Sequence, residues 1–173
     1  MLLSANSAQR FIENYKRVLL EIHRQSAEES DEDIITVLAA ARAKLKNNPA
    51  LLEQVATALA VAGQHVEPDI LQALGSMQLG QWVYLRSTTR YAIFIDQAVE
   101  NGYAVLGLTN AVEDIVGATA VAFETAVLKF EGHYVCDGIV QNPVFLGPSY
   151  RKQFNAALAQ IKKDGRFHAS SEP

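Results

Sequence analysis

Hydrophobic residues in the first part of the chain recur with the spacing of amphipathic helices. Between residues 7 and 25 they form a stripe opposite a charged face: Phe11, Tyr15, Val18, Leu19 and Ile22. Ser30 and the acidic residues after it predict the start of a second helix, with the stripe Ile34, Leu38, Ala41 and Leu45. Asn48-Pro49 is expected to start a third helix that ends at Gly63. Residues 68–74 predict a short fourth helix closed by Gly75.

At Gly80 the pattern changes to β-branched and aromatic residues, which favour strands. The expected strands are residues 82–87, 91–96, 103–108, 119–130 and 133–141. Turns are predicted between them at residues 87–90, Asn101-Gly102 and Glu131-Gly132. A short helix is expected over residues 111–116, ended by Gly117. Pro143 limits the last strand to an edge or an end, because proline cannot donate a ladder hydrogen bond.

Residues 118–130 fit two patterns. One helix face would carry Val112, Ile115, Thr119, Phe123, Val127 and Phe130. A strand is equally consistent with the alternation of Val121, Phe123, Thr125 and Val127. We interpret the segment as a strand, because Gly117 ends the preceding helix and Glu131-Gly132 reads as a hairpin turn. A helix over these residues is the alternative interpretation.

These elements predict an α+β protein in which a helical module, residues 1–78, packs on a sheet domain, residues 79–166. The sheet is expected to be mostly antiparallel, with about five strands. A C-terminal helix should start at Gly147-Pro148 and cover one face of the sheet through Phe154, Leu158 and Ile161. Residues 167–173 are expected to be a disordered tail.

Composition narrows the class of protein. The 173 residues are 49% hydrophobic and 20% charged, which is typical of a globular protein. The formal charge of -4 gives no overall attraction for nucleic acid or for an anionic membrane. The single cysteine, Cys136, excludes an intramolecular disulfide and fits a reducing compartment. The N-terminus lacks the pattern of a secretory signal and no apolar run is long enough to span a bilayer, so we expect a cytoplasmic protein.

The residues around Cys136 suggest two chemical arrangements. A nucleophile would need Cys136 beside His133 and Asp137, but in a regular strand it points away from both, which favours a buried structural cysteine. His133 and Asp137 share a strand face and could form an acid/base pair or half of a metal site. The other histidines are scattered along the sequence, so we expect no metal and no cofactor.

A ligand site is suggested at the start of the last helix. Free backbone amides and the positive end of the helix dipole favour an anion there, close to Ser149 and Arg151. Arg86 and Arg90 flank the first hairpin turn and could converge on the same place, with Asp137 as the general base. The simpler interpretation is ordinary helix capping, since any helix that starts with proline has the same local pattern.

The last third of the chain carries short motifs, Val135-Cys136-Asp137-Gly138 and Phe145-Leu146-Gly147-Pro148-Ser149-Tyr150-Arg151. They resemble a domain of uncharacterised bacterial proteins, in which a strand-borne Asp-Gly precedes a Phe-x-Gly-Pro element and a basic helix. The resemblance covers about half the chain, residues 82–163. It implies no known activity, and it supports the strand interpretation of residues 119–130.

Function is less constrained than fold. The glycines lack the spacing of a phosphate-binding loop, and strand aromatics such as Tyr84 and Tyr91 are more typical of a core than of an RNA-binding face. We therefore expect a non-catalytic interaction or regulatory protein that associates with itself or with a protein partner. The alternative hypothesis is a small-molecule or anion-binding enzyme whose site includes Arg86, Arg90, Asp137 and Ser149.

Overall fold

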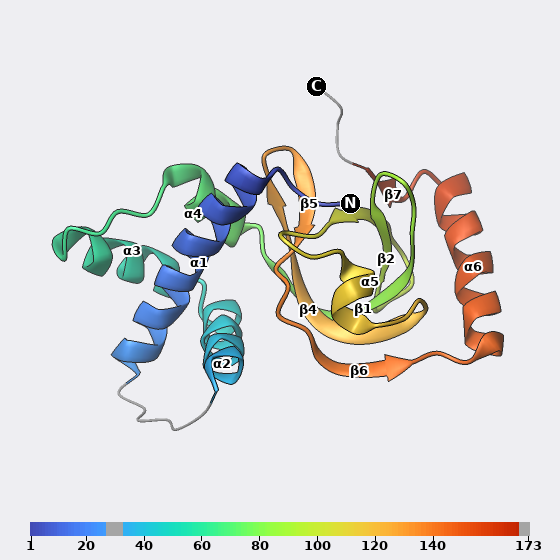
Figure 1. The fold of residues 1–173 in the computed structure, drawn as a ribbon, viewed down its shortest axis with the longest axis horizontal. Helices are drawn as coiled ribbons and strands as arrows, with labels where there is room; N and C mark the ends of the chain where they lie inside the picture. The colour runs from blue at the N-terminus through green and yellow to red at the C-terminus, as the bar shows by residue number, and fades with distance from the viewer. Residues whose placement is uncertain (27–32, 170–173) are drawn as a thin grey trace.

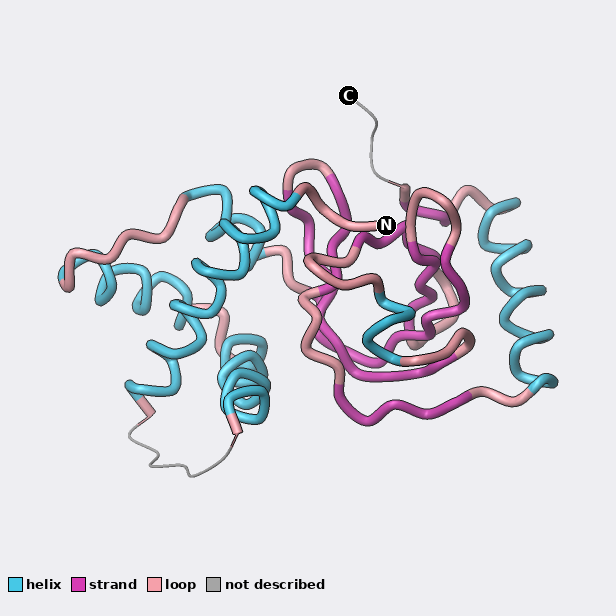
Figure 2. Tube along the Cα trace, in the orientation of Figure 1, coloured by secondary structure: helices cyan, strands magenta, loops and turns pink. Residues whose placement is uncertain are grey.

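The computed structural model describes residues 1–26 and 33–169, which form a helical module on one side of a β-barrel and a long helix on the other (Figure 1). Within the described residues the module contains four helices: α1 (Ala5–Gln25), α2 (Ile34–Asn47), α3 (Leu51–Val61) and α4 (Pro68–Gly75). The strands are β1 (Gln78–Ser87), β2 (Ala92–Asp96), β3 (Gly102–Leu106), β4 (Val121–Phe130), β5 (His133–Cys136), β6 (Gln141–Phe145) and β7 (Phe167–His168). Helices α5 (Val112–Val116) and α6 (Pro148–Lys163) complete the fold. Figure 2 shows strands in the centre and helices on both sides.

Five of the strands close into a barrel. β1 pairs antiparallel with β2 on one side and with β4 on the other, and β2 pairs antiparallel with β3. β5 joins β3 in parallel and β4 in antiparallel orientation, so the order β1-β2-β3-β5-β4 returns to β1. Because β4 returns to lie beside β1 after the β1-β2-β3 meander, the connection is a Greek key. A closed five-stranded Greek-key barrel is the architecture of OB-fold domains.

Local geometry explains how the barrel closes. β1 can serve two neighbours because it is long and bends at a bulge between Tyr84 and Arg86. After β3 the chain folds back so tightly that a Cβ at Gly107 would clash with the carbonyl oxygen of Asn110. The N-terminal residues lie against this loop after β3, since the Leu3 N–H donates to the Gly107 carbonyl at 2.9 Å.

Three groups of buried side chains hold the layers together. The barrel interior is rich in aromatic residues: Trp82, Tyr84, Phe94, Tyr103 and Phe123. The outer surface of β1 and β2 packs against α6 through Val83, Leu85, Ile93, Ile95, Leu158 and Ile161. The outer surface of β4 and β5 packs against the helical module, where Phe130 lies 5.2 Å from Phe11 between ring centroids. Because side chains alternate along each strand, the barrel has an apolar interior and also two apolar patches on its outside, each covered by helices.

The α+β fold class predicted from the sequence is confirmed. The strand interpretation of residues 118–130 is also confirmed, as β4 spans Val121–Phe130. Glu131 and Gly132 both have positive φ, at 48° and 77°, and form the predicted hairpin turn. Pro143 was expected to limit the strand at 133–141 to an edge or an end. Pro143 instead lies in β6, at one end of the sheet order, whereas β5 pairs with both β3 and β4. α6 covers one side of the sheet through the predicted Leu158 and Ile161.

The start of α2 differs from the sequence interpretation. The predicted N-cap, Ser30, lies outside the described residues. In the structure Asp33 is the N-cap, and its side chain accepts hydrogen bonds from the backbone N–H groups of Ile35 and Thr36 at 2.9 and 3.2 Å. Ile34 is exposed rather than part of the buried stripe, because the buried face is centred on the row of Leu38, Ala41 and Leu45.

One predicted helix start and one predicted turn are also corrected. Asn48-Pro49 does not begin α3; the Leu51 N–H donates to the Asn48 carbonyl in a turn that precedes the helix. Asn101-Gly102 is not a two-residue hairpin turn, since neither residue has positive φ. The longer loop before β3 is instead held by the Asp96 carboxylate, which accepts from the Glu100 and Asn101 N–H groups.

Three corrections concern the strands. The described residues form a mixed sheet of seven strands rather than about five. The predicted strand 133–141 is wrong as a single element, because Gly138 (φ 79°) turns the chain after β5 and β6 begins at Gln141. Phe167 and His168 are not part of a disordered tail; they form β7, which pairs in parallel with β3. The last predicted tail residues, 170–173, lie outside the described residues.

Candidate functional site

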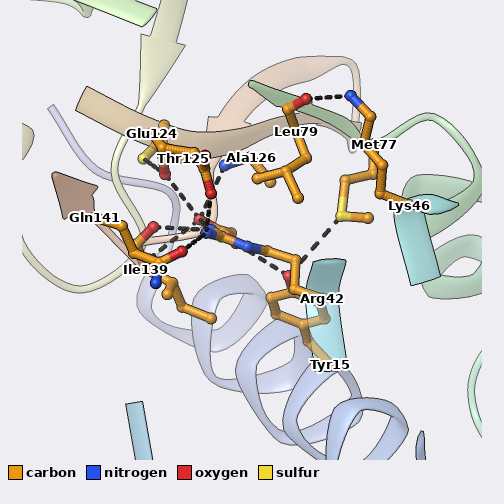
Figure 3. Close-up of polar contacts among 12 residues, drawn as sticks. Tyr15, Arg42, Lys46, Met77, Leu79, Glu124, Thr125, Ala126, Ile139 and Gln141 are labelled. Atoms are coloured by element: carbon orange, nitrogen blue, oxygen red, sulfur yellow. Dashed lines mark hydrogen bonds and ion pairs between the residues drawn. The ribbon is translucent and has the colours of Figure 1, made fainter. Parts of the chain in front are cut away.

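Asp137 lies at the junction between the barrel and the helical module. It follows β5 directly, and its backbone N–H donates to the Ala126 carbonyl of β4 at 3.0 Å. The carboxylate is buried, which is rare for an aspartate without a compensating partner. Figure 3 shows Tyr15 of α1, Arg42 of α2 and Thr125 of β4 converging on this junction.

Five residues donate hydrogen bonds to the Asp137 carboxylate. The Arg42 guanidinium donates to both carboxylate oxygens, at 2.8 and 3.1 Å. The Tyr15 hydroxyl donates at 3.0 Å and the Thr125 hydroxyl at 2.9 Å. The backbone N–H groups of Ile139 and Ala126 donate at 3.1 and 3.4 Å. Both carboxylate oxygens are therefore occupied by donors of the chain itself.

Arg42 is the cation that balances this carboxylate, and its side chain is 0% exposed. It also donates to the Ile139 carbonyl at 2.8 Å and to the Gln141 amide oxygen at 3.2 Å. Glu124 lies 3.9 Å away, at the partly exposed side of the cluster. The Nε atom of Arg42 is buried without a partner. A buried charge of this kind is tolerated only when paired, so the Arg42–Asp137 pair joins α2 to the barrel.

The surroundings of Asp137 keep the Tyr15 hydroxyl and the Cys136 thiol protonated and therefore neutral. Burial, and then the negative charge of Asp137, raise the pKa of Tyr15 well above its usual value, so the hydroxyl stays a hydrogen-bond donor. Burial also raises the pKa of Cys136 to about 11. The Cys136 thiol lies 3.4 Å from the Thr125 hydroxyl. The ion pair of Asp137 and Arg42 is thus surrounded by a neutral hydroxyl and a neutral thiol, with Glu124 at its partly exposed side.

Cys136 is a buried structural cysteine, as the sequence favoured. Because thiolate is the reactive form and the thiol pKa is about 11, we expect iodoacetamide to alkylate the folded chain at least about a hundredfold more slowly than the urea-unfolded chain. Mass spectrometry of timed samples at mildly alkaline pH measures both rates. Equal rates in the two states would contradict the buried position of the thiol.

The structure does not bring the predicted anion-site residues together around Asp137. Arg86 donates to the Asn155 side chain of α6 at 2.5 Å, and Arg151 donates to the Thr119 hydroxyl at 3.1 Å. Ser149 is exposed in the first turn of α6. These residues lie around the start of α6, beside a shallow 480 Å³ hollow lined by Leu146, Pro148, Arg151, Lys152 and Asn155. Asp137 is instead buried and held by Arg42, and it does not line this hollow.

Arg90 belongs to a different hollow of about 690 Å³, between the N-terminal residues, β3 and the β4–β5 turn. Its lining also includes Tyr91, Leu106, Glu131 and His133. Glu131 is paired with Arg10 of α1 at 2.6 Å, which neutralises its charge. His133 lines this hollow. The strand alternation that would have placed His133 and Asp137 on the same face ends at Cys136, the last residue of β5.

The sequence interpretation missed Arg42 and Tyr15, the two helical members of the site. A signal was present for both. Tyr15 was already part of the apolar stripe of α1, and Arg42 stands four residues after Leu38 and three before Leu45, on the buried face of α2. A basic residue inside an apolar stripe indicates a buried ion pair, but its partner 95 residues away is not identified by local spacing.

No group of three or more His, Cys, Asp or Glu side chains that could hold a metal ion occurs in the described part of the chain. None of the helices in residues 1–26 and 33–169 combines the length and the apolar character needed to cross a bilayer.

Comparison with protein-family models, curated proteins and solved structures finds no match to this chain. The resemblance to a bacterial domain therefore stays a prediction.

Proposed function

We propose that the chain is a non-catalytic interaction protein, in which the helical module and the barrel form one unit that presents β6 to a protein partner. The exposure of β6 is the observation that carries this proposal. β6 lies at one end of the sheet order, and Val144 and Phe145 are 58% and 65% exposed. Large apolar side chains on an edge strand favour a protein contact.

The buried junction supports the non-catalytic part of the proposal. A general base needs a lone pair that can reach a substrate, and the Asp137 oxygens are occupied by five donors in a buried position. The enzyme hypothesis relied on Asp137 beside Arg86 and Arg90, and it receives little support from this arrangement. Asp137 is better explained as the residue that fixes α1 and α2 to the barrel.

Nucleic-acid binding is also less well supported. OB-fold barrels bind oligonucleotides on the outer face of their second and third strands. In this chain α6 packs against that side, where Leu158 and Ile161 meet Ile93 and Ile95. A fold alone does not assign a function, and here the usual binding face is partly occupied by the chain itself.

Co-purification from the cells that produce the protein tests the proposal. We expect a partner protein that is recovered with the tagged wild-type chain and with a Val61→Ser variant, and is lost with Phe145→Ser. Val61 is a matched control, since it is 86% exposed and belongs to α3, a helix that lies far from β6 (Figure 1). Identical sets of recovered proteins for the three chains, measured by quantitative mass spectrometry, would contradict an interaction role for β6.

A further inference from the structure

The free edge of β6 is a template for another strand. β6 pairs antiparallel with β4, matching Phe145 with Val121 and Val144 with Ala122. No strand of the described residues pairs with its other side. A bulge near Asn142 (φ 52°) and the missing donor of Pro143 restrict the regular part of this edge to its last residues. Unpaired backbone N–H and C=O groups at such an edge can bind an extended peptide.

Apolar side chains surround this edge. Phe145 pairs with the inward-facing Val121 and Val144 with Ala122, so consecutive residues of β6 expose apolar surface on both faces of the strand. Tyr150, in the first turn of α6, is 58% exposed. The 480 Å³ hollow beside Leu146 and Pro148 continues the same surface. An incoming strand would therefore find apolar contacts on either side of its backbone.

The residues that follow this edge along the chain carry only positive charges, and the carboxylate nearest in register, Glu124 opposite Gln141, lies 3.9 Å from Arg42. Residues 141–160 contain Arg151 and Lys152 and no aspartate or glutamate. Arg86 lies beside them through its hydrogen bond with Asn155. None of these three cations forms an ion pair with a carboxylate in residues 1–26 and 33–169. Their charges are thus left for a partner to neutralise.

We propose that β6 binds an extended segment of a partner protein in which acidic and apolar side chains alternate. This inference rests on the proposed function and specifies the chemistry of the partner. The backbone edge selects an extended peptide, the exposed Val144, Phe145 and Tyr150 select apolar side chains, and the cations select carboxylates. A second copy of this chain fits less well, because its own residues 141–160 bring further cations and no carboxylate. Nucleic acid could neutralise the cations but could not pair with the strand edge.

Selection from a phage-displayed library of random dodecapeptides tests this proposal with purified protein. We expect the enriched peptides to alternate Asp or Glu with Val, Ile or Phe and to lack proline. In fluorescence anisotropy their affinity should fall at least about tenfold for Phe145→Ser and for the double variant Arg151→Glu/Lys152→Glu. The control Lys162→Glu/Lys163→Glu, at the other end of α6, should leave it within about twofold. Added salt should weaken binding to the wild-type chain.

Each other outcome overturns the proposal. Enriched peptides that are neutral or basic, or that bind the Phe145→Ser variant equally well, would exclude an acidic strand at β6. Displacement of the peptides by single-stranded RNA at a lower concentration than by free peptide would assign the cations to nucleic acid. Circular dichroism of each variant verifies that it is folded. If co-purification depends on Phe145 while the selection fails, the interaction role stands and only the partner chemistry is wrong.

Discussion

Replacing Asp137 by asparagine is expected to lower the free energy of unfolding by about 3–5 kcal/mol, because it leaves Arg42 buried without a full counter-charge. Glu124 cannot compensate at 3.9 Å from the guanidinium and partly in solvent. Urea unfolding followed by circular dichroism measures the change. The control is Arg24→Ala, which removes an ion pair with Glu21 from a side chain that is 72% exposed and should change the stability far less.

A double-mutant cycle measures the interaction energy between Arg42 and Asp137 separately from the contacts that each residue makes with its other neighbours. Arg42→Met should also destabilise, since Asp137 then keeps only neutral donors. The double variant Arg42→Met/Asp137→Asn should cost less than the sum of the single variants, with a coupling of about 1–3 kcal/mol. Additive effects, or an Asp137→Asn change no larger than that of the Arg24→Ala control, would show that the pair does not join the module to the barrel.

Alkaline pH is expected to destabilise the protein strongly. The pKa of Cys136 is 9.0 in a solvated chain and about 11 in the fold, and the pKa of Tyr15 is also raised by folding. Above pH 9 the unfolded chain therefore binds fewer protons than the folded chain, so unfolding becomes easier as the pH rises. Stability should be unaffected by these groups below pH 9, and Cys136 alone should remove about 2–3 kcal/mol by pH 11.

The variants Cys136→Ala and Tyr15→Phe test this linkage. Each removes one titrating group, so its free energy of unfolding should fall less steeply above pH 9 than that of the wild-type chain, whatever its stability at neutral pH. Urea unfolding at a series of pH values gives the slopes. If both variants have the same slope as the wild-type chain, folding does not raise the pKa values of Cys136 and Tyr15, and the account is contradicted.

The sequence was sufficient for most elements because their signals are local. The stripe of α1, the Gly117 stop of α5 and the positive-φ pair Glu131-Gly132 depend only on neighbouring residues. Asn101-Gly102 failed because a tight-turn signal competed with the Asp96 carboxylate, which holds a longer loop. The closure of the barrel was not predicted, since the pairing of β1 with β4 joins segments far apart in the chain.

The candidate site was harder to predict for the same reason. The sequence placed Asp137 in an anion site with Arg86 and Arg90. In the structure its helical partners are Tyr15 and Arg42, which reach it only after α1 and α2 pack on β4 and β5. The arginines chosen from the sequence, Arg86 and Arg90, lie on the strand ends and loops of β1 and β2. No spacing rule could exclude their convergence with Asp137, because the direction of each strand in the barrel was unknown.

Site-specific photo-crosslinking tests the central claim most directly. A photoreactive phenylalanine analogue is placed at position 145 on β6, or at position 61 on α3 as the control, and the cells that produce the protein are irradiated. The account predicts a covalent adduct with another protein from position 145 only, with the partner's crosslinked peptide rich in acidic residues. Adducts of equal yield from both positions, or none from position 145, would contradict the claim that β6 is the interaction surface.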